Sequence, residues 1–180
     1  MQDAFEALDD PARLSTGITG LDDILGGGLD PNSLYLLEGK PGTGKTTLGL
    51  QFLLDGVQRG EKGLYITLSE TERELRVVAA RHGWSLDDVL IYQLMPAEAT
   101  FAPDQELTVF HPVETELSET TNLILDHVRK HEPVRIVFDS LSELRLLAQS
   151  PLRYRRQILA LKHFFAGRSC TVLLLDDLSQ

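Results

Sequence analysis

The sequence has a single cysteine, Cys170, so it cannot form a disulfide within the chain, and a lone cysteine fits a reducing compartment. Long apolar runs are also missing: none goes beyond about five residues, whereas a membrane-spanning helix needs about 20. The first ten residues, MQDAFEALDD, are acidic and lack the apolar core of a secretory signal. These absences predict a soluble cytoplasmic protein without a membrane partner.

Positive charge is scarce, with 17 lysines and arginines against 27 aspartates and glutamates and a net charge of −10. A chain this acidic repels nucleic-acid backbones as a whole, so nucleic acid is not an expected partner. The basic residues are nevertheless clustered, because no acidic residue lies between Leu144 and Leu175. That stretch contains Arg145, Arg153, Arg155, Arg156, Lys162 and Arg168. Three interpretations stay open: a solvated helix face, a surface that meets the acidic part of a neighbouring subunit, and a local polynucleotide site.

The 180 residues, 42% of them hydrophobic and 24% charged, fit one globular domain. Short apolar segments rich in β-forming residues alternate with amphipathic helical patterns along most of the chain. We predict strands at Leu34–Leu37, Gly63–Leu68, Leu90–Leu94, Val134–Phe138 and Thr171–Leu175. Strands that alternate with helices indicate an α/β fold with a mainly parallel sheet and helices on both faces.

Other local signals mark where elements begin and where the pattern stops. The capping-box pattern occurs in Ser69 with Glu72 and in Ser140 with Glu143. Pro151 predicts the start of a new helix, because proline is tolerated in the first turn and not in a helix interior. Residues 96–118 hold three prolines and little periodicity, so we expect a loop insertion there, and residues 1–12 an acidic tail.

The segment GKPGTGKT, which ends at Thr46, matches the phosphate-loop motif G-x-x-x-x-G-K-[ST] in full. A strand pattern precedes it and a helical pattern follows, so backbone N–H groups and a helix N-terminus can face phosphates. Lys45 would reach the β- and γ-phosphates and take part in catalysis, and the Thr46 hydroxyl would ligate Mg²⁺. An ordinary glycine-rich turn is the alternative. The predicted nucleotide-binding residues are Gly39, Lys40, Pro41, Gly42, Thr43, Gly44, Lys45, Thr46 and Thr47.

Two carboxylates could complete such a site. The apolar strand VRIVF ends at Asp139, which is the Walker B pattern, so Asp139 would hold Mg²⁺ through its water shell. A helix-capping aspartate is the alternative. Hydrolysis also needs a group that orients the attacking water, and Glu70, after the second predicted strand, is the candidate catalytic residue. Its alternative is an acid in the first turn of a helix, where the helix dipole favours a negative charge.

Taken together, these segments resemble the KaiC branch of the RecA-like P-loop ATPases, which includes the circadian-clock protein and non-clock relatives. The matching pieces are STGITGLDDILGGGLDPNS before the loop, GKPGTGKTT in it, YITLSETERELR after it, VRIVFDSLSEL at Walker B, and RYRRQILALKHFFAGRSCTVLLLDD. The resemblance implies a three-layer RecA-like core whose Thr171–Leu175 strand lies between the Walker A and Walker B strands. It also implies an ATP site at the subunit boundary of a ring, a hexamer, with Asp176 as a γ-phosphate sensor.

The chain departs from this branch in two places. The branch often has two consecutive glutamates after the second strand, the first usually regarded as the base, whereas this chain has Ser69-Glu70. KaiC-like domains normally continue past the position of Gln180 with further strands, so the chain looks like a single domain truncated at its C-terminus. The leading hypothesis is an Mg²⁺-dependent ATPase with a signalling or regulatory role. The alternatives are a serine/threonine autokinase, a weakly hydrolytic assembly switch with protein partners, and RecA-type DNA handling.

Overall fold

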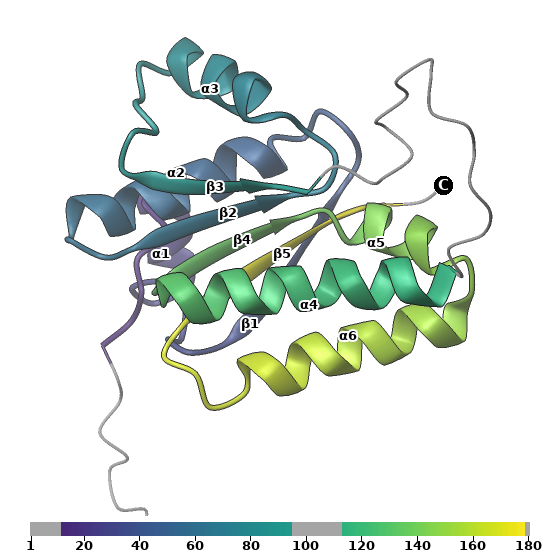
Figure 1. Ribbon diagram of the computed structural model, residues 1–180. Helices are drawn as coiled ribbons and strands as arrows, with labels where there is room; N and C mark the ends of the chain where they lie inside the picture. Colours follow the sequence, from purple (N-terminus) through teal and green to yellow (C-terminus); the bar gives the residue numbers. More distant parts are fainter. Residues whose placement is uncertain (1–11, 95–112, 179–180) are drawn as a thin grey trace, which may run out of the picture.

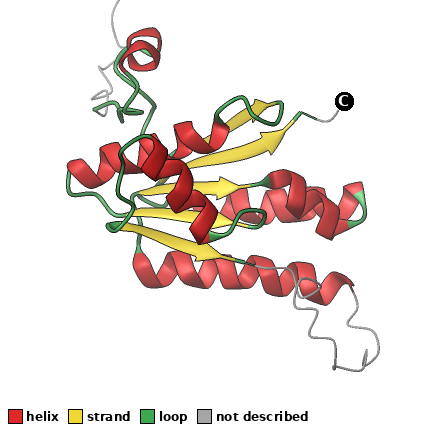
Figure 2. Ribbon diagram, turned by 90° about the horizontal axis from the view of Figure 1, so that it is seen from above, coloured by secondary structure: helices red, strands yellow, loops and turns green. Residues whose placement is uncertain are grey.

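The computed structural model describes residues 12–94 and 113–178. Its centre is a sheet in which every pair of neighbouring strands is parallel, in the order β1-β5-β4-β2-β3 (Figures 1 and 2). The strands are β1 (Leu34–Gly39), β2 (Gly63–Thr67), β3 (Val89–Gln93), β4 (Arg135–Asp139) and β5 (Thr171–Asp177). All five predicted strands are therefore confirmed with small shifts at their ends, and β5 lies between the two motif strands as the resemblance implied.

Helices cover both faces of the sheet, as Figure 1 shows. The helices are α1 (Thr19–Ile24), α2 (Lys45–Gln58), α3 (Glu72–Arg81), α4 (Val113–His131), α5 (Leu141–Ala148) and α6 (Pro151–Phe165). One apolar cluster joins α2 and α3 to the sheet, and a second joins α4, α5 and α6 to its other face. Because side chains alternate along a strand, odd-numbered residues of β4 and β5 such as Val137 and Leu173 face α2. The predicted three-layer α/β fold is confirmed.

Two boundary predictions need correction. Helix α3 is capped by Thr71, which forms a capping box with Glu74, and not by Ser69 with Glu72. The reason is that the Thr67 hydroxyl accepts the N–H groups of Ser69 and Glu70, which holds them in a turn before the helix. At α5, Ser140 occupies the N-cap position, but its side chain makes no capping hydrogen bond.

The remaining boundary predictions concern the start of α4, the start of α6 and the N-terminal tail. Helix α4 already begins at Val113, so the predicted loop 96–118 is too long by six residues, and 96–112 lie outside the described residues. Pro151 stands in the first turn of α6, as predicted. The acidic tail 1–12 lies outside the described residues except for its last position. Among the described helices, none has the length and apolar character needed to cross a membrane.

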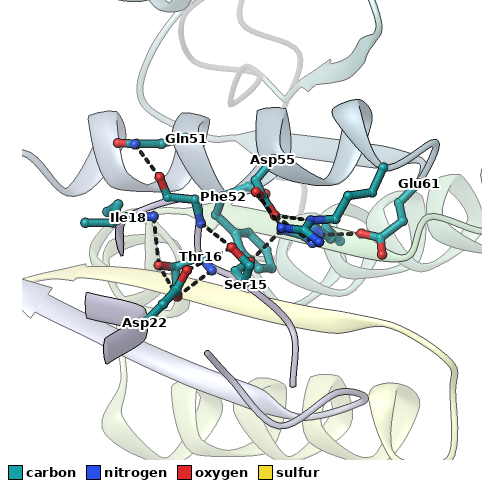
Figure 3. A network of polar contacts seen from close by, with 11 residues as sticks. Ser15, Thr16, Ile18, Asp22, Gln51, Phe52, Asp55 and Glu61 are labelled. Carbon is teal, nitrogen blue, oxygen red and sulfur yellow. Dashed lines mark hydrogen bonds and ion pairs between the residues drawn. The ribbon is translucent and has the colours of Figure 1, made fainter. Parts of the chain in front are cut away.

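A buried arginine on β4 links the segment before β1 to helix α2, and its partners Ser15, Asp55 and Glu61 are labelled in Figure 3. Arg135, at the start of β4, is fully buried and donates to the carbonyl oxygens of Ser15 and Phe52, each at 2.8 Å. Its guanidinium also pairs with Glu61 at 2.5 Å and with Asp55 at 3.1 Å. A buried charge is tolerated only when it is paired and hydrogen-bonded: Nε and Nη1 of Arg135 make hydrogen bonds, and Nη2 is paired with Asp55 but makes no hydrogen bond among the described residues.

The segment before β1 is itself held by short polar contacts. Asp22 accepts hydrogen bonds from the backbone N–H and hydroxyl of Thr16 and from the Ser15 hydroxyl. Gln51 of α2 donates to the Gly17 carbonyl at 2.6 Å. In the same region a side chain at Gly56 would place its Cβ 2.5 Å from the Arg135 side chain, so only glycine fits there. The segment before β1 is thus held against helix α2, and the phosphate-loop motif lies at the N-terminal end of the same helix.

Candidate nucleotide-binding site

The phosphate-loop motif lies at the carboxyl edge of the sheet, between the end of β1 and the start of α2. Gly42 and Gly44 have φ angles of +80° and +93°, which side chains rarely adopt. A Cβ on Gly39 would lie 2.6 Å from the Thr43 hydroxyl, which instead donates to the Lys40 carbonyl at 2.8 Å. The loop is therefore a tight turn that runs directly into the N-terminus of a 14-residue helix, where unpaired backbone N–H groups favour a bound anion.

Lys45 lies across this loop with its side chain largely buried. Its Nζ donates to the carbonyl oxygens of Gly39, at 2.9 Å, and Lys40, at 3.1 Å, and it pairs with Asp177 of β5 at 2.8 Å. These contacts hold the ammonium group at the mouth of the loop, where phosphates would bind. Thr46 follows on the first turn of α2, and Thr47 comes next, both half-buried.

Asp139 ends β4 on the face of the sheet that α2 covers. Its Oδ2 accepts a hydrogen bond from the Tyr65 hydroxyl at 2.6 Å. Burial raises the pKa of Asp139, and the Asp177 charge raises it further, whereas the Tyr65 hydrogen bond, Lys45 and the Thr46 hydroxyl lower it; the net pKa is above the ordinary value. Burial disfavours the ionised form of the Asp139 carboxyl, whereas a nearby positive charge favours it. A carboxylate in this position is therefore suited to bind a cation.

Glu70 lies beyond the end of β2 and outside helix α3, whose N-cap is Thr71. Its backbone is held by Thr67, which donates to the Glu70 carbonyl and accepts the Glu70 N–H. The side chain turns inward, and its Oε2 is buried without a hydrogen-bond partner among the described residues. Burial, then the charges of Asp139 and Glu74, raise the pKa of Glu70, and the Thr46 hydroxyl partly offsets this. Glu70 is therefore not a first-turn helix acid.

The side chains of Lys45, Thr46, Asp139 and Glu70 come from α2, β4 and the turn between β2 and α3, and they meet at one edge of the sheet. The Thr46 hydroxyl lies close enough to both carboxyls to lower the pKa of each. Mg²⁺ prefers oxygen ligands and usually keeps several waters, so a hydroxyl, a carboxylate and an unpaired buried carboxylate oxygen fit this ion. The arrangement can hold a polyphosphate beside Lys45 and a magnesium ion beside Thr46 and Asp139.

Comparisons with known proteins identify the family of this chain. Residues 14–180 match the family model for the KaiC ATPase. The chain belongs to the KaiC ATPase family. A UPF0273 protein of Pyrococcus furiosus is 34% identical over 93% of this chain and 69% of its own length, and one of Thermotoga maritima is 30% identical over 93% and 70%.

The crystal structure of a similar protein supports the fold of this KaiC-family chain. The crystal structure of a KaiC-like protein from the archaeon Pyrococcus horikoshii matches with a TM-score of 0.73 and 25% sequence identity. The match covers 92% of this chain and 72% of the other. The RecA-like P-loop assignment made from the motifs is thus confirmed, and membership of an ATPase family implies that the domain binds a nucleotide.

One site prediction does not agree with the structure of this KaiC domain. The resemblance predicts that Asp176 faces the γ-phosphate, but its side chain lies on the face of the sheet that α5 covers, away from α2 and Lys45. There it accepts hydrogen bonds from Ser142, at 2.6 Å, and Arg145, at 2.5 Å. The next residue, Asp177, faces Lys45 instead, because successive residues of a strand alternate between faces. The acid beside the loop is therefore Asp177.

Tyr65 and Asp177 are site residues that the motifs do not indicate. Alternation along the strands predicts which positions share a face, as Tyr65, Val137 and Leu175 do in the cluster facing α2, but it does not predict which of the two faces meets α2. The basic stretch is also partly explained: Arg145 is paired with Asp176, and the Arg168 guanidinium lies 4.0 Å from the Phe164 ring centroid. Arg155, Arg156 and Lys162 are exposed on α6.

Proposed function

We propose that this KaiC-family chain binds ATP with Mg²⁺ and hydrolyses it to ADP and phosphate. The observation that carries the proposal is the convergence of Lys45, Thr46, Asp139 and the unpaired Glu70 oxygen at one end of the phosphate loop. Lys45 would neutralise charge on the β- and γ-phosphates, and Thr46 and Asp139 would hold the metal. Bound Mg²⁺ would supply positive charge to the phosphate oxygens.

In this reaction the oxygen of a water molecule forms a bond to the γ-phosphorus while the bond to the β–γ bridging oxygen breaks. Glu70 would accept a hydrogen bond from that water and take its proton, and ADP would leave with the bridging oxygen. A carboxylate whose pKa is raised is a better proton acceptor at neutral pH than an ordinary one. The buried, unpartnered Oε2 of Glu70 supports this role, because a water molecule would satisfy it.

Lys45→Ala should weaken ATP binding by about 30- to 100-fold, since it removes a charged donor from a partly buried phosphate site. Isothermal titration with ATP and Mg²⁺ would measure it. Lys62→Ala is the control, because Lys62 is an exposed lysine that precedes β2 at the opposite edge of the sheet, where its side chain donates to the His131 carbonyl. ATP binding by Lys45→Ala equal to that of the wild type would contradict the assignment.

Asp177→Asn should strengthen ATP binding by up to about fivefold. The Asp177 carboxylate pairs with Lys45 at 2.8 Å, so phosphates must compete with it, and a half-exposed ion pair contributes up to about 1 kcal/mol. Asp176→Asn is the control from the same strand end, since Asp176 faces Arg145 on the other side of the sheet. If both variants bind ATP alike, Asp177 does not compete for Lys45.

A second candidate is a nucleotide-dependent assembly switch with slow hydrolysis. It is favoured by Ser69-Glu70, because the position before Glu70 holds an exposed serine in place of a second carboxylate. We propose for either candidate a homo-oligomer, a hexameric ring, with ATP at the subunit boundary. Mass by light scattering with and without ATP, measured beside the turnover rate, separates the two. Transfer of labelled phosphate to the protein would instead indicate the autokinase.

A further inference from the structure

The Tyr65 hydroxyl contacts a carboxylate that would help to hold magnesium. Tyr65 is the third residue of β2, and its side chain is fully buried. The hydroxyl donates a hydrogen bond to Oδ2 of Asp139 at 2.6 Å, so it joins β2 to the end of β4.

The Tyr65 side chain carries a polar hydroxyl although its neighbours are mostly apolar. Tyr65 belongs to the apolar cluster that contains Leu50, Val137 and Leu175, where a phenylalanine would fill nearly the same volume. Burying a hydroxyl costs free energy unless it finds a partner, and the partner here is a carboxylate at the end of the neighbouring strand. The phenol therefore contributes something besides packing, and what it contacts is the candidate metal site.

We propose that Tyr65 is a positioning residue of the magnesium site, orienting Asp139 through its hydroxyl. The proposal rests on the proposed function. The hydrogen bond from the phenol to Oδ2 fixes the orientation of the Asp139 carboxylate, one of the groups that would hold the ion. Partners of this kind typically change metal affinity by about 10- to 100-fold.

The test compares ATP binding at increasing Mg²⁺ concentrations with ATP binding in EDTA, using wild type and Tyr65→Phe. The Mg²⁺ concentration that gives half of the metal-dependent gain in affinity should rise about 10- to 100-fold in Tyr65→Phe. ATP affinity in EDTA should stay the same, because the phosphate loop is untouched. Tyr35→Phe is the matched control, since its hydroxyl bonds the backbone of Asp30 in the segment that precedes β1.

A double-mutant cycle with Asp139→Asn shows whether Tyr65 acts through that carboxylate. In the Asp139→Asn background, Tyr65→Phe should change the Mg²⁺ dependence by less than about twofold. The double variant also controls for misfolding, because it removes the Asp139 carboxylate together with the Tyr65 hydroxyl that donates to it. Fully additive effects, or an unchanged Mg²⁺ dependence in Tyr65→Phe, would overturn the proposal. Absence of Mg²⁺-dependent binding in the wild type would overturn the proposed function as well.

Discussion

Glu70→Gln should lower the rate of ATP hydrolysis by about 10²- to 10⁴-fold while ATP affinity stays nearly unchanged. Glutamine keeps the shape of the side chain but cannot accept a proton from water. The carboxyl also makes no hydrogen bond through Oε2 among the described residues, so replacing it should not unfold the domain. Single-turnover hydrolysis of ATP, measured beside equilibrium ATP binding, separates the two effects.

The pH dependence of the rate gives a second measure of Glu70. Burial, with the charges of Asp139 and Glu74, raises the pKa of this carboxyl above its ordinary value. The wild-type rate should therefore fall as the pH drops through that raised pKa, because the protonated form cannot act as a base. Glu70→Gln should lack this acid limb. Glu72→Gln is the control, since Glu72 pairs with Arg76 on the exposed side of α3. A wild-type rate in Glu70→Gln would remove Glu70 from the mechanism.

Arg135→Ala should lower the free energy of unfolding by about 3–5 kcal/mol, a large part of a domain's total stability. The substitution leaves Glu61 and Asp55 without their buried cation and two carbonyl oxygens without a donor. It also empties space beside the Phe52 ring, which the guanidinium covers at 4.9 Å. Urea unfolding followed by circular dichroism would measure the change.

Arg59→Ala is the matched control for Arg135. Arg59 pairs with the same Asp55, but its side chain is exposed, and an exposed pair contributes under about 1 kcal/mol. Arg135 lies at the start of β4 and makes no contact with the phosphate loop, so ATP affinity of the folded Arg135→Ala protein should match that of the wild type. A loss below about 1 kcal/mol would show that the buried cluster does not stabilise the fold.

Much of the site could be predicted because it rests on local motifs. The phosphate loop needs glycines, a lysine and a threonine at consecutive positions, and the structure places a strand before them and a helix after them. Asp139 was predictable because an apolar strand precedes it. Ser69 was a wrong helix cap because the hydroxyl of Thr67 accepts the N–H groups of Ser69 and Glu70, a turn that the capping pattern does not reveal, and α3 begins only at Glu72.

By itself the sequence predicted the order of strands and helices, the parallel sheet and the place of the phosphate-loop motif between a strand and a helix, because hydrophobic periodicity and loop chemistry are local properties. Only the tertiary structure decided which of two adjacent aspartates faces Lys45, since that depends on how β5 is registered between β1 and β4. It also brought Tyr65 to Asp139 and Arg135 to Glu61, both pairs 74 positions apart in the chain. Burial gives these contacts their strength, and burial arises only when the layers pack together.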